Sequence, residues 1–77
     1  MTTTRWYLAV APHLWGRGTT PEEAKEQLKK VGADLRKKYK IYEMPEGTRE
    51  CWVDDMGCLC WKLIKGADRT GRTKELQ

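Results

Sequence analysis

The chain has 77 residues and a formal net charge of +4, a size that suits one small domain. Its charged residues, 34% of the total, carry both signs, which describes an ordinary water-exposed surface as well as a partner for acidic molecules. Three cysteines, an odd number, argue against a disulfide-stapled secreted protein and favour a cytoplasmic one. We also expect no signal peptide and no membrane contact, because no segment approaches the ~20 apolar residues of a membrane span.

The first expected element is a strand over residues 5–11, in which large apolar side chains occupy every second position. Pro12 ends this strand, because proline cannot donate a hydrogen bond to a neighbouring strand. Residues 13–18 form a connector, and a return to extended structure over residues 15–17 remains open. The two glycines of the connector indicate tight or positive-φ positions. The alternating apolar residues of the strand are Trp6, Leu8 and Val10.

A helix start is the clearest local signal of the chain. Thr20 is the expected N-cap, Pro21 the first helical residue and Glu23 the capping partner three residues after the cap. Apolar residues then recur at the spacing of a buried helical stripe. Gly32 is the expected end in a left-handed conformation, although a further helical turn over residues 33–37 remains open. The residues of the stripe are Ala24, Leu28 and Val31.

Three strands are expected after the helix. The first covers residues 38–44 and ends at the turn signal Pro-Glu-Gly of residues 45–47. The other two, residues 49–54 and 58–64, form a hairpin. Its connection favours a type I turn with a bulge, because a glycine occupies the position that needs a left-handed residue.

The register of this hairpin decides where the cysteines lie. A one-residue slip would set Cys51 opposite Cys60, but it would also move the apolar residues of one strand to the wrong face. We therefore prefer the bulged register, in which Cys51 belongs to the core. The predicted pairs are Val53 with Leu59 and Cys51 with Trp61. The residues placed on the opposite face are Trp52, Cys58 and Cys60.

These elements predict an α+β fold in the order β-α-β-β-β, with one helix packed on a mainly antiparallel sheet in two layers. Residues 1–64 form the single domain. Residues 65–77 contain almost no apolar side chains, which predicts a flexible basic tail. The predicted core consists of Trp6, Leu8, Val10, Ala24, Leu28, Val31, Ile41, Cys51, Val53, Leu59, Trp61 and Leu63.

The glycines before the helix suggest a phosphate-binding site, but the neighbouring residues argue against one. Pro21 removes an amide donor, while Glu22 and Glu23 place negative charge where an anion would sit. The spacing of Cys58 and Cys60 does not fit a zinc knuckle, which argues against a metal site as well. The chain has no serine, and its single histidine, His13, has no paired carboxylate nearby in the sequence. We expect no enzyme, cofactor, metal or small-molecule substrate.

A contact surface is the favoured functional feature. A single helix covers only one face of a small sheet, so apolar residues on the second face should remain partly exposed, and such patches mark partner or dimer interfaces. This reasoning predicts a protein-binding module that engages a protein partner or forms a homodimer. The residues of this predicted surface are Trp52, Cys58, Cys60, Ile64 and Tyr42.

Nucleic-acid binding is the alternative function. The densest basic cluster of the chain follows the helix, and basic residues of the tail could join it to contact phosphates. The competing explanation is a solvated helix end and an edge strand whose lysines block pairing. The residues concerned are Arg36, Lys37, Lys38, Lys40, Arg69 and Arg72.

The run LWGRGTTPEEA resembles the passage from strand to helix in HicB-type antitoxins, in which a glycine, a threonine cap and a Glu-Glu-Ala helix start follow the last strand. The resemblance covers Trp15 to Leu28. It implies a small sheet domain that binds and blocks a toxin. The chain as a whole is similar to short phage and plasmid accessory proteins, some of which inhibit host defence systems, and this implies action in the host cytoplasm.

Overall fold

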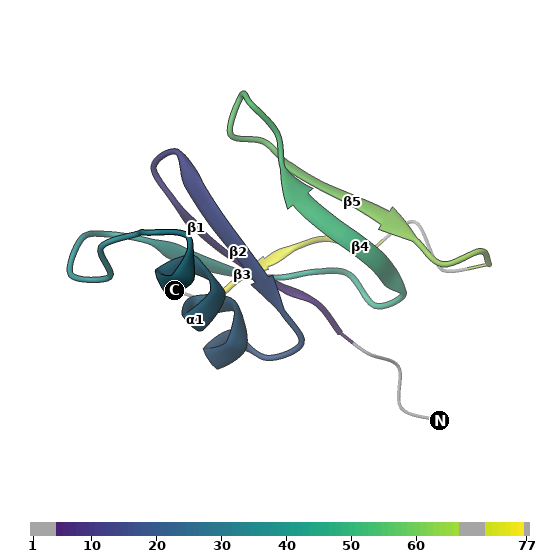
Figure 1. Cartoon of the computed structure of the whole chain (residues 1–77). Coiled ribbons are helices and arrows are strands. Elements are labelled where there is room, and N and C mark those ends of the chain that lie inside the picture. Colours follow the sequence, from purple (N-terminus) through teal and green to yellow (C-terminus); the bar gives the residue numbers. More distant parts are fainter. Residues whose placement is uncertain (1–4, 67–70, 77) are drawn as a thin grey trace.

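The computed structural model describes residues 5–66 and 71–76, which form one helix and six strands (Figure 1). All strand pairs are antiparallel, so the predicted α+β class with one helix and antiparallel strands is confirmed. No helix in this part of the chain is long and apolar enough to cross a membrane. The elements are β1 (Tyr7–Ala11), β2 (Leu14–Gly18), α1 (Pro21–Lys30), β3 (Lys40–Glu43), β4 (Thr48–Val53), β5 (Leu59–Leu63) and β6 (Lys74–Glu75).

The predicted order β-α-β-β-β is wrong, because it lacks β2 and β6. The connector after Pro12 returns as β2 and pairs with β1, so that Ala11 lies opposite Leu14. Within the segment predicted as a flexible tail, β6 pairs with β3 and places Glu75 opposite Tyr42. Residues 67–70 and 77 of that segment lie outside the described residues, and the domain boundary after residue 64 stays a prediction.

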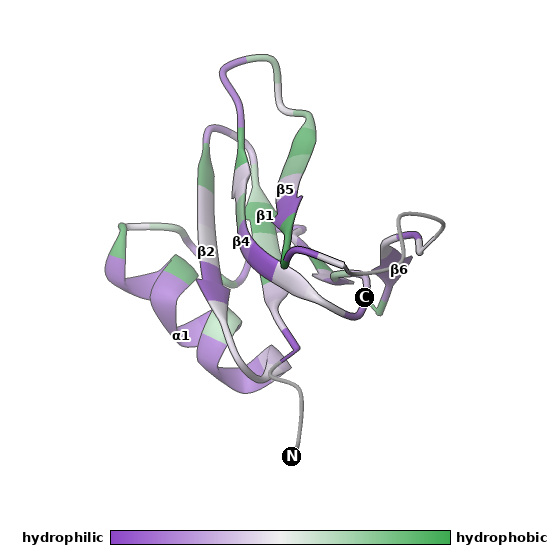
Figure 2. Cartoon of the chain, turned by 90° about the vertical axis from the view of Figure 1, so that its right-hand side faces the viewer, coloured by the Kyte–Doolittle hydropathy of each residue, from purple (hydrophilic) through white to green (hydrophobic). Residues whose placement is uncertain are grey.

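Three layers replace the two that we predicted. Four strands form one sheet in the order β2-β1-β3-β6, and β4 and β5 form a separate hairpin. The helix covers one face of the sheet and the hairpin packs on the other (Figure 1). Figure 2 shows the helix as largely hydrophilic, because only a narrow stripe of it faces the sheet. A sheet covered on both faces needs apolar residues on both.

The protein therefore has two cores, one on each face of the sheet. The first joins Ala9 of β1 to the helix, and the second joins Leu8 of the same strand to the hairpin. Successive side chains of a strand point to opposite faces, so the predicted packing of the Leu8 face against the helix is wrong. The buried residues of the first core are Ala9, Ala24, Leu28 and Ile41. Those of the second are Leu8, Met44 and Cys51.

The ends of α1 follow the sequence signals closely. The side chain of Thr20 accepts a hydrogen bond of 3.0 Å from the Glu23 amide, as predicted for the N-cap. The Glu23 carboxylate instead accepts from the Thr19 hydroxyl at 3.1 Å. Gly32 has φ 102°, and the amides of Gly32 and Ala33 bond back to the last turn in the pattern of a Schellman motif. Val31 is the C-cap and is 52% exposed, so its predicted place in the core is wrong.

Close packing of the helix on β2 explains the two glycines before the helix. A Cβ atom on Gly16 would lie 2.4 Å from the backbone nitrogen of Leu28. A Cβ atom on Gly18 would lie 2.7 Å from that of Ala24. These glycines are therefore required by the short distance between strand and helix, and neither has a positive φ.

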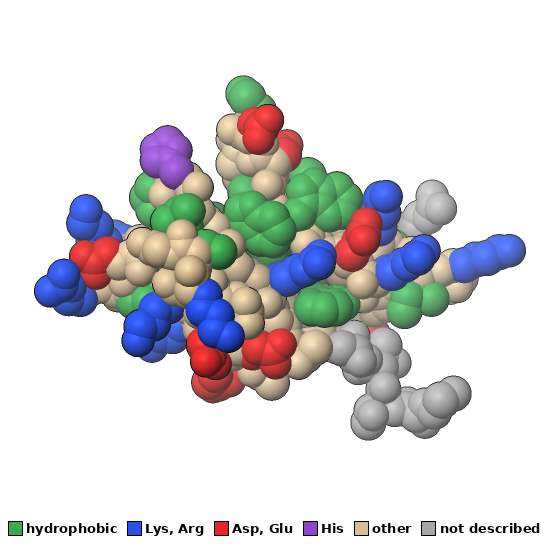
Figure 3. Space-filling view, in the orientation of Figure 1, with side chains coloured by type: hydrophobic (Ala, Val, Ile, Leu, Met, Phe, Trp, Pro, Cys, Tyr) green, Lys and Arg blue, Asp and Glu red, His purple; other side chains and the backbone are tan. Residues whose placement is uncertain are grey.

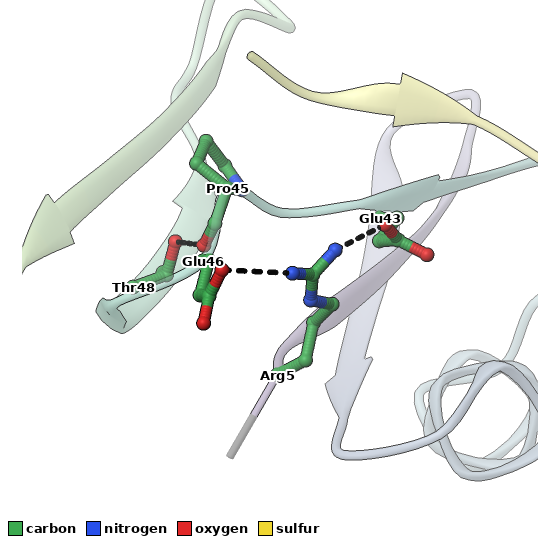
Figure 4. A network of polar contacts seen from close by, with 5 residues as sticks. All are labelled: Arg5, Glu43, Pro45, Glu46 and Thr48. Carbon is green, nitrogen blue, oxygen red and sulfur yellow. Dashed lines mark hydrogen bonds and ion pairs between the residues drawn. The ribbon is translucent and has the colours of Figure 1, made fainter. Parts of the chain in front are cut away.

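A polar network holds the turn between β3 and β4 (Figure 4). Arg5 forms ion pairs with Glu43 at the end of β3 and with Glu46 in the turn. The hydroxyl of Thr48, 1% exposed, donates to the carbonyl of Pro45, so this buried polar side chain is satisfied. The network fixes the direction in which the chain leaves the sheet to start the hairpin.

Candidate functional site

A cleft of about 680 Å³ lies between two turns far apart in the sequence. One turn joins β1 to β2 and the other joins β4 to β5, and the two hairpins diverge toward these ends (Figure 1). The space-filling view shows a notch between the two projecting ends (Figure 3). We call this hollow the tip cleft. Its apolar lining includes Val10, Trp15 and Val53, and its polar lining includes His13, Lys40, Asp54 and Asp55.

Strained backbone marks the first wall of the tip cleft. His13 has φ 67°, the one positive value at a non-glycine position in the described chain. Pro12 precedes it in a two-residue turn, and a proline cannot supply the positive φ that the favoured hairpin turns require at this position. The left-handed conformation therefore falls on His13. Such strain costs on the order of 1 kcal/mol and is common where a loop carries a function.

A rigid turn forms the second wall. The Asp54 carboxylate accepts hydrogen bonds from the amides of Met56 at 2.9 Å and Cys58 at 2.8 Å. Gly57 has φ 80° and its amide bonds to the carbonyl of Asp54, as the predicted type I turn with a bulge requires. Because Asp54 is used by the turn, Asp55 and Met56 form the exposed part of this wall, and Met56 is 85% exposed.

The predicted hairpin register is confirmed. Val53 lies opposite Leu59 and Cys51 opposite Trp61, and these side chains pack in the second core. Cys51 is fully buried, and this burial raises the pKa of its thiol to about 11. The predicted place of Cys51 in the core is therefore correct.

The outer face of the hairpin differs from the apolar surface that we predicted. Trp52 lies opposite Cys60, and the ammonium group of Lys62 lies 5.9 Å from the centre of the Trp52 ring. Lys62 also pairs with the carboxylate of Glu50 at 3.5 Å. Charged side chains therefore stand among the aromatic ones. The predicted contact role of this face stays a prediction.

The remaining residues of the predicted protein-binding surface do not gather around Trp52. Tyr42 packs in the second core, between the sheet and the hairpin, so it does not belong to that surface. Cys58 is exposed in the turn, and Ile64 is 49% exposed after β5. Desolvation and the nearby Asp54 carboxylate raise the pKa of the Cys60 thiol, which makes it a poor nucleophile.

The basic cluster after the helix is partly neutralised. Arg36 pairs with Asp34 at 3.1 Å, and its hydrogen bonds lower the pKa of the Asp34 carboxyl. Lys40 pairs with Glu75 of β6 at 3.5 Å. Lys37 and Lys38 are exposed. Arg72 is exposed as well, and Arg69 lies outside the described residues.

Among the described residues, no group of three His, Cys, Asp or Glu side chains could hold a metal ion. The tip cleft is lined by apolar side chains together with a few charged ones, a combination that is typical of a binding site. The sequence did not predict this cleft. Its one local signal was the pair Pro12–His13, which is short enough to join two strands directly.

Comparison with known proteins gave no match: no protein-family model fits the chain, and neither characterised proteins nor solved structures resemble it. The resemblance to HicB-type antitoxins therefore stays a prediction.

Proposed function

We propose that this protein is a small, non-enzymatic binding module that takes an apolar segment of a protein partner into the tip cleft. The observation that carries the proposal is the hollow of about 680 Å³ between the two turns, with Val10, Trp15 and Val53 in its lining. Burying one large apolar side chain in such a site contributes about 1.5–3 kcal/mol. Met56 at the edge adds a flexible apolar contact that adapts to its partner.

Charged groups at the edge supply orientation. His13 lies in the β1–β2 turn, Lys40 at the start of β3 and Asp55 in the hairpin turn. A partner segment with an apolar residue between polar ones would meet both the interior and this charged edge. In the form suggested by the sequence, the partner is a toxin or a host defence protein in the cytoplasm, and the module inhibits it by contact.

Two matched substitutions test the cleft. The full chain, with a photo-crosslinking residue at position 56, is expressed in its host to capture the partner. The captured partner is then purified by itself, and the wild-type chain and its variants are titrated against it. Met56→Asp should weaken its binding about tenfold or more, because the exposed side chain enters the contact. Ile64→Asp changes a similarly exposed apolar residue away from the cleft and should leave binding unchanged. Loss of partner binding with Ile64→Asp alone would contradict the proposal and would indicate a contact on the outer face of the hairpin.

Nucleic-acid binding is the second candidate function, and the exposed Lys37 and Lys38 are the observation that favours it. It has less support, because Arg36 and Lys40 are each paired with a carboxylate. Titration with DNA and RNA at low salt tests it. Binding that weakens with added salt and with a Lys37→Ala, Lys38→Ala double variant would favour this function over the cleft.

A further inference from the structure

The strand β2 has a free edge with unused backbone groups. It is the outermost strand of the sheet in the order β2-β1-β3-β6. Ala11 and Leu14 flank the two-residue turn and form a hydrogen-bonded pair, so the bonding positions of β2 alternate from Leu14. The amide and carbonyl groups of Trp15 and Arg17 therefore point away from β1.

An observed bond in β1 supports this alternation. The amide of Met44 donates to the carbonyl of Trp6 at 2.9 Å, on the side of β1 that faces β3. Even-numbered residues of β1 thus bond toward β3, and odd-numbered ones bond toward β2. Ala9 then bonds with Gly16, and the residues on either side of Gly16 remain open to a further strand.

A shallow groove of about 540 Å³ runs along this edge. Trp15 and Arg17 line it from the strand, and Gln27 and Val31 line it from the helix. Gly16 keeps the helix close to the strand, so the groove is walled on that side by the helix itself.

Natural edge strands are usually protected against pairing by lysine, proline or a bulge. Residues 14–18 contain neither lysine nor proline, and their pairs with β1 run without a register shift. The free side of β4 differs, because the Arg17 side chain donates to the Cys51 carbonyl there. Of the β2 edge and the free side of β4, the β2 edge is therefore the one that is open to a further strand.

We propose that a second copy of this chain pairs with β2 through a two-fold axis at Gly16, forming an antiparallel β2–β2 contact. This arrangement sets Trp15 opposite Arg17 of the partner subunit and, by symmetry, Arg17 opposite Trp15 of the partner subunit. The two residues lie on one face of the strand, so each indole meets the apolar stem of an arginine. A two-fold interface requires a self-complementary patch, and this one is.

The position of the helix on β2 is compatible with this two-fold arrangement. Gly16 lies level with Gln27, and Gly18 lies level with Glu23 and Ala24, so the helix runs antiparallel to β2. A two-fold axis at Gly16 brings the two helices side by side in opposite directions. Because Gly16 lies level with Gln27, Glu23 of each helix then lies level with Val31 of the other. A second helix beside the exposed Val31, which also lines the groove, would cover it, whereas an added peptide strand alone would not, and this favours a second copy over an unrelated peptide.

Sedimentation of the full chain over a wide concentration range tests the proposal. We expect a reversible monomer–dimer equilibrium. Arg17→Pro removes the outward amide without breaking the bonds to β1, and it should raise the dimer dissociation constant about tenfold or more. Arg17→Ala is the matched control, because it removes the side chain but keeps the amide, and it should weaken the dimer less.

Amide hydrogen exchange gives a test that needs no variant. In the wild-type chain, the amides of Trp15 and Arg17 should become more protected as the concentration rises, while the helix amides should not change. A monomer at all concentrations would contradict the proposal, as would a dimer that Arg17→Pro leaves intact. A dimer whose Trp15 and Arg17 amides exchange equally fast at low and high concentration would also contradict it. The cleft proposal does not depend on these results, because its test measures binding of another protein.

Discussion

Arg17 of β2 donates a hydrogen bond of 3.2 Å to the backbone carbonyl of Cys51 in β4. Its guanidinium also lies 5.6 Å from the centre of the Trp6 ring. One side chain thus connects the edge of the sheet, the start of β1 and the hairpin above them. Arg17 and Cys51 lie 34 residues apart in the sequence, so this bond joins distant parts of the chain.

Arg17→Ala should lower the free energy of unfolding by about 1–2 kcal/mol, because a charged donor and a cation–π contact are lost together. Urea unfolding of the two proteins measures the difference. Arg49→Ala, at an exposed arginine of β4, is the control and should change stability by less than about 0.5 kcal/mol. Equal effects of the two substitutions would show that the Arg17 contacts contribute nothing specific.

Gly16→Ala should destabilise the fold by about 3 kcal/mol, because the new Cβ atom would collide with the helix backbone rather than with a flexible side chain. Gly32→Ala should cost only about 1 kcal/mol, since the space around Gly32 is open and the strain is confined to its positive φ. Thermal unfolding ranks the two. The reverse ranking would mean that the helix is free to move away from β2.

Thr20→Ala should lower stability by about 1 kcal/mol, because the first turn of the helix loses the acceptor for the Glu23 amide. The neighbouring substitution Thr19→Ala removes an exposed bond to the Glu23 side chain and should cost less than about 0.5 kcal/mol. Circular dichroism during urea unfolding compares them. A similar loss from both would place the cap at Thr19 instead.

Cys51 should be chemically protected in the folded protein, and Cys58 should not. A thiol reagent at pH 8 should modify Cys58 quickly and reach Cys51 only on unfolding, because Cys51 is buried and its pKa is raised to about 11. Mass spectrometry of the labelled peptides identifies the modified residue. Rapid labelling of Cys51 in the native protein would mean that the hairpin opens readily.

The same thiol predicts a loss of stability in alkali. The folded state holds the Cys51 proton more tightly than the unfolded chain, whose thiol has a pKa near 9.0. Its contribution is therefore complete below pH 9 and is lost as the pH rises through about 11. Comparing the pH dependence of unfolding in the wild type and in Cys51→Ala separates this effect from other groups that titrate there. Parallel curves would contradict it.

Local signals predicted those parts of the fold that local chemistry determines. Thr20 and Gly32 marked the helix ends, and the Asp54–Gly57 turn set the hairpin register. The strand β2 was left as an open alternative over residues 15–17, because its helix-facing positions are glycines and show no apolar alternation. Leu8 was assigned to the helix layer because a single sequence does not tell which face of a strand each layer covers.

The tip cleft could not be predicted from the sequence for a similar reason. Its walls come from turns at Pro12–His13 and Asp54–Gly57, which only the packing of the hairpin on the sheet brings together. The protein-binding residues predicted from the hairpin pattern assumed that one face of the sheet was bare. The hairpin covers that face, so Tyr42 lies in a core.

The division into two cores sets an order of assembly. Every residue of the first core lies between Tyr7 and Ile41, so the helix layer can form before the second half of the chain has left the ribosome. The second core cannot form this early, because it packs Leu8 against residues of the hairpin that are synthesised later. These include Cys51, Leu59 and Trp61. The hairpin should therefore be the last unit to fold and the first to open.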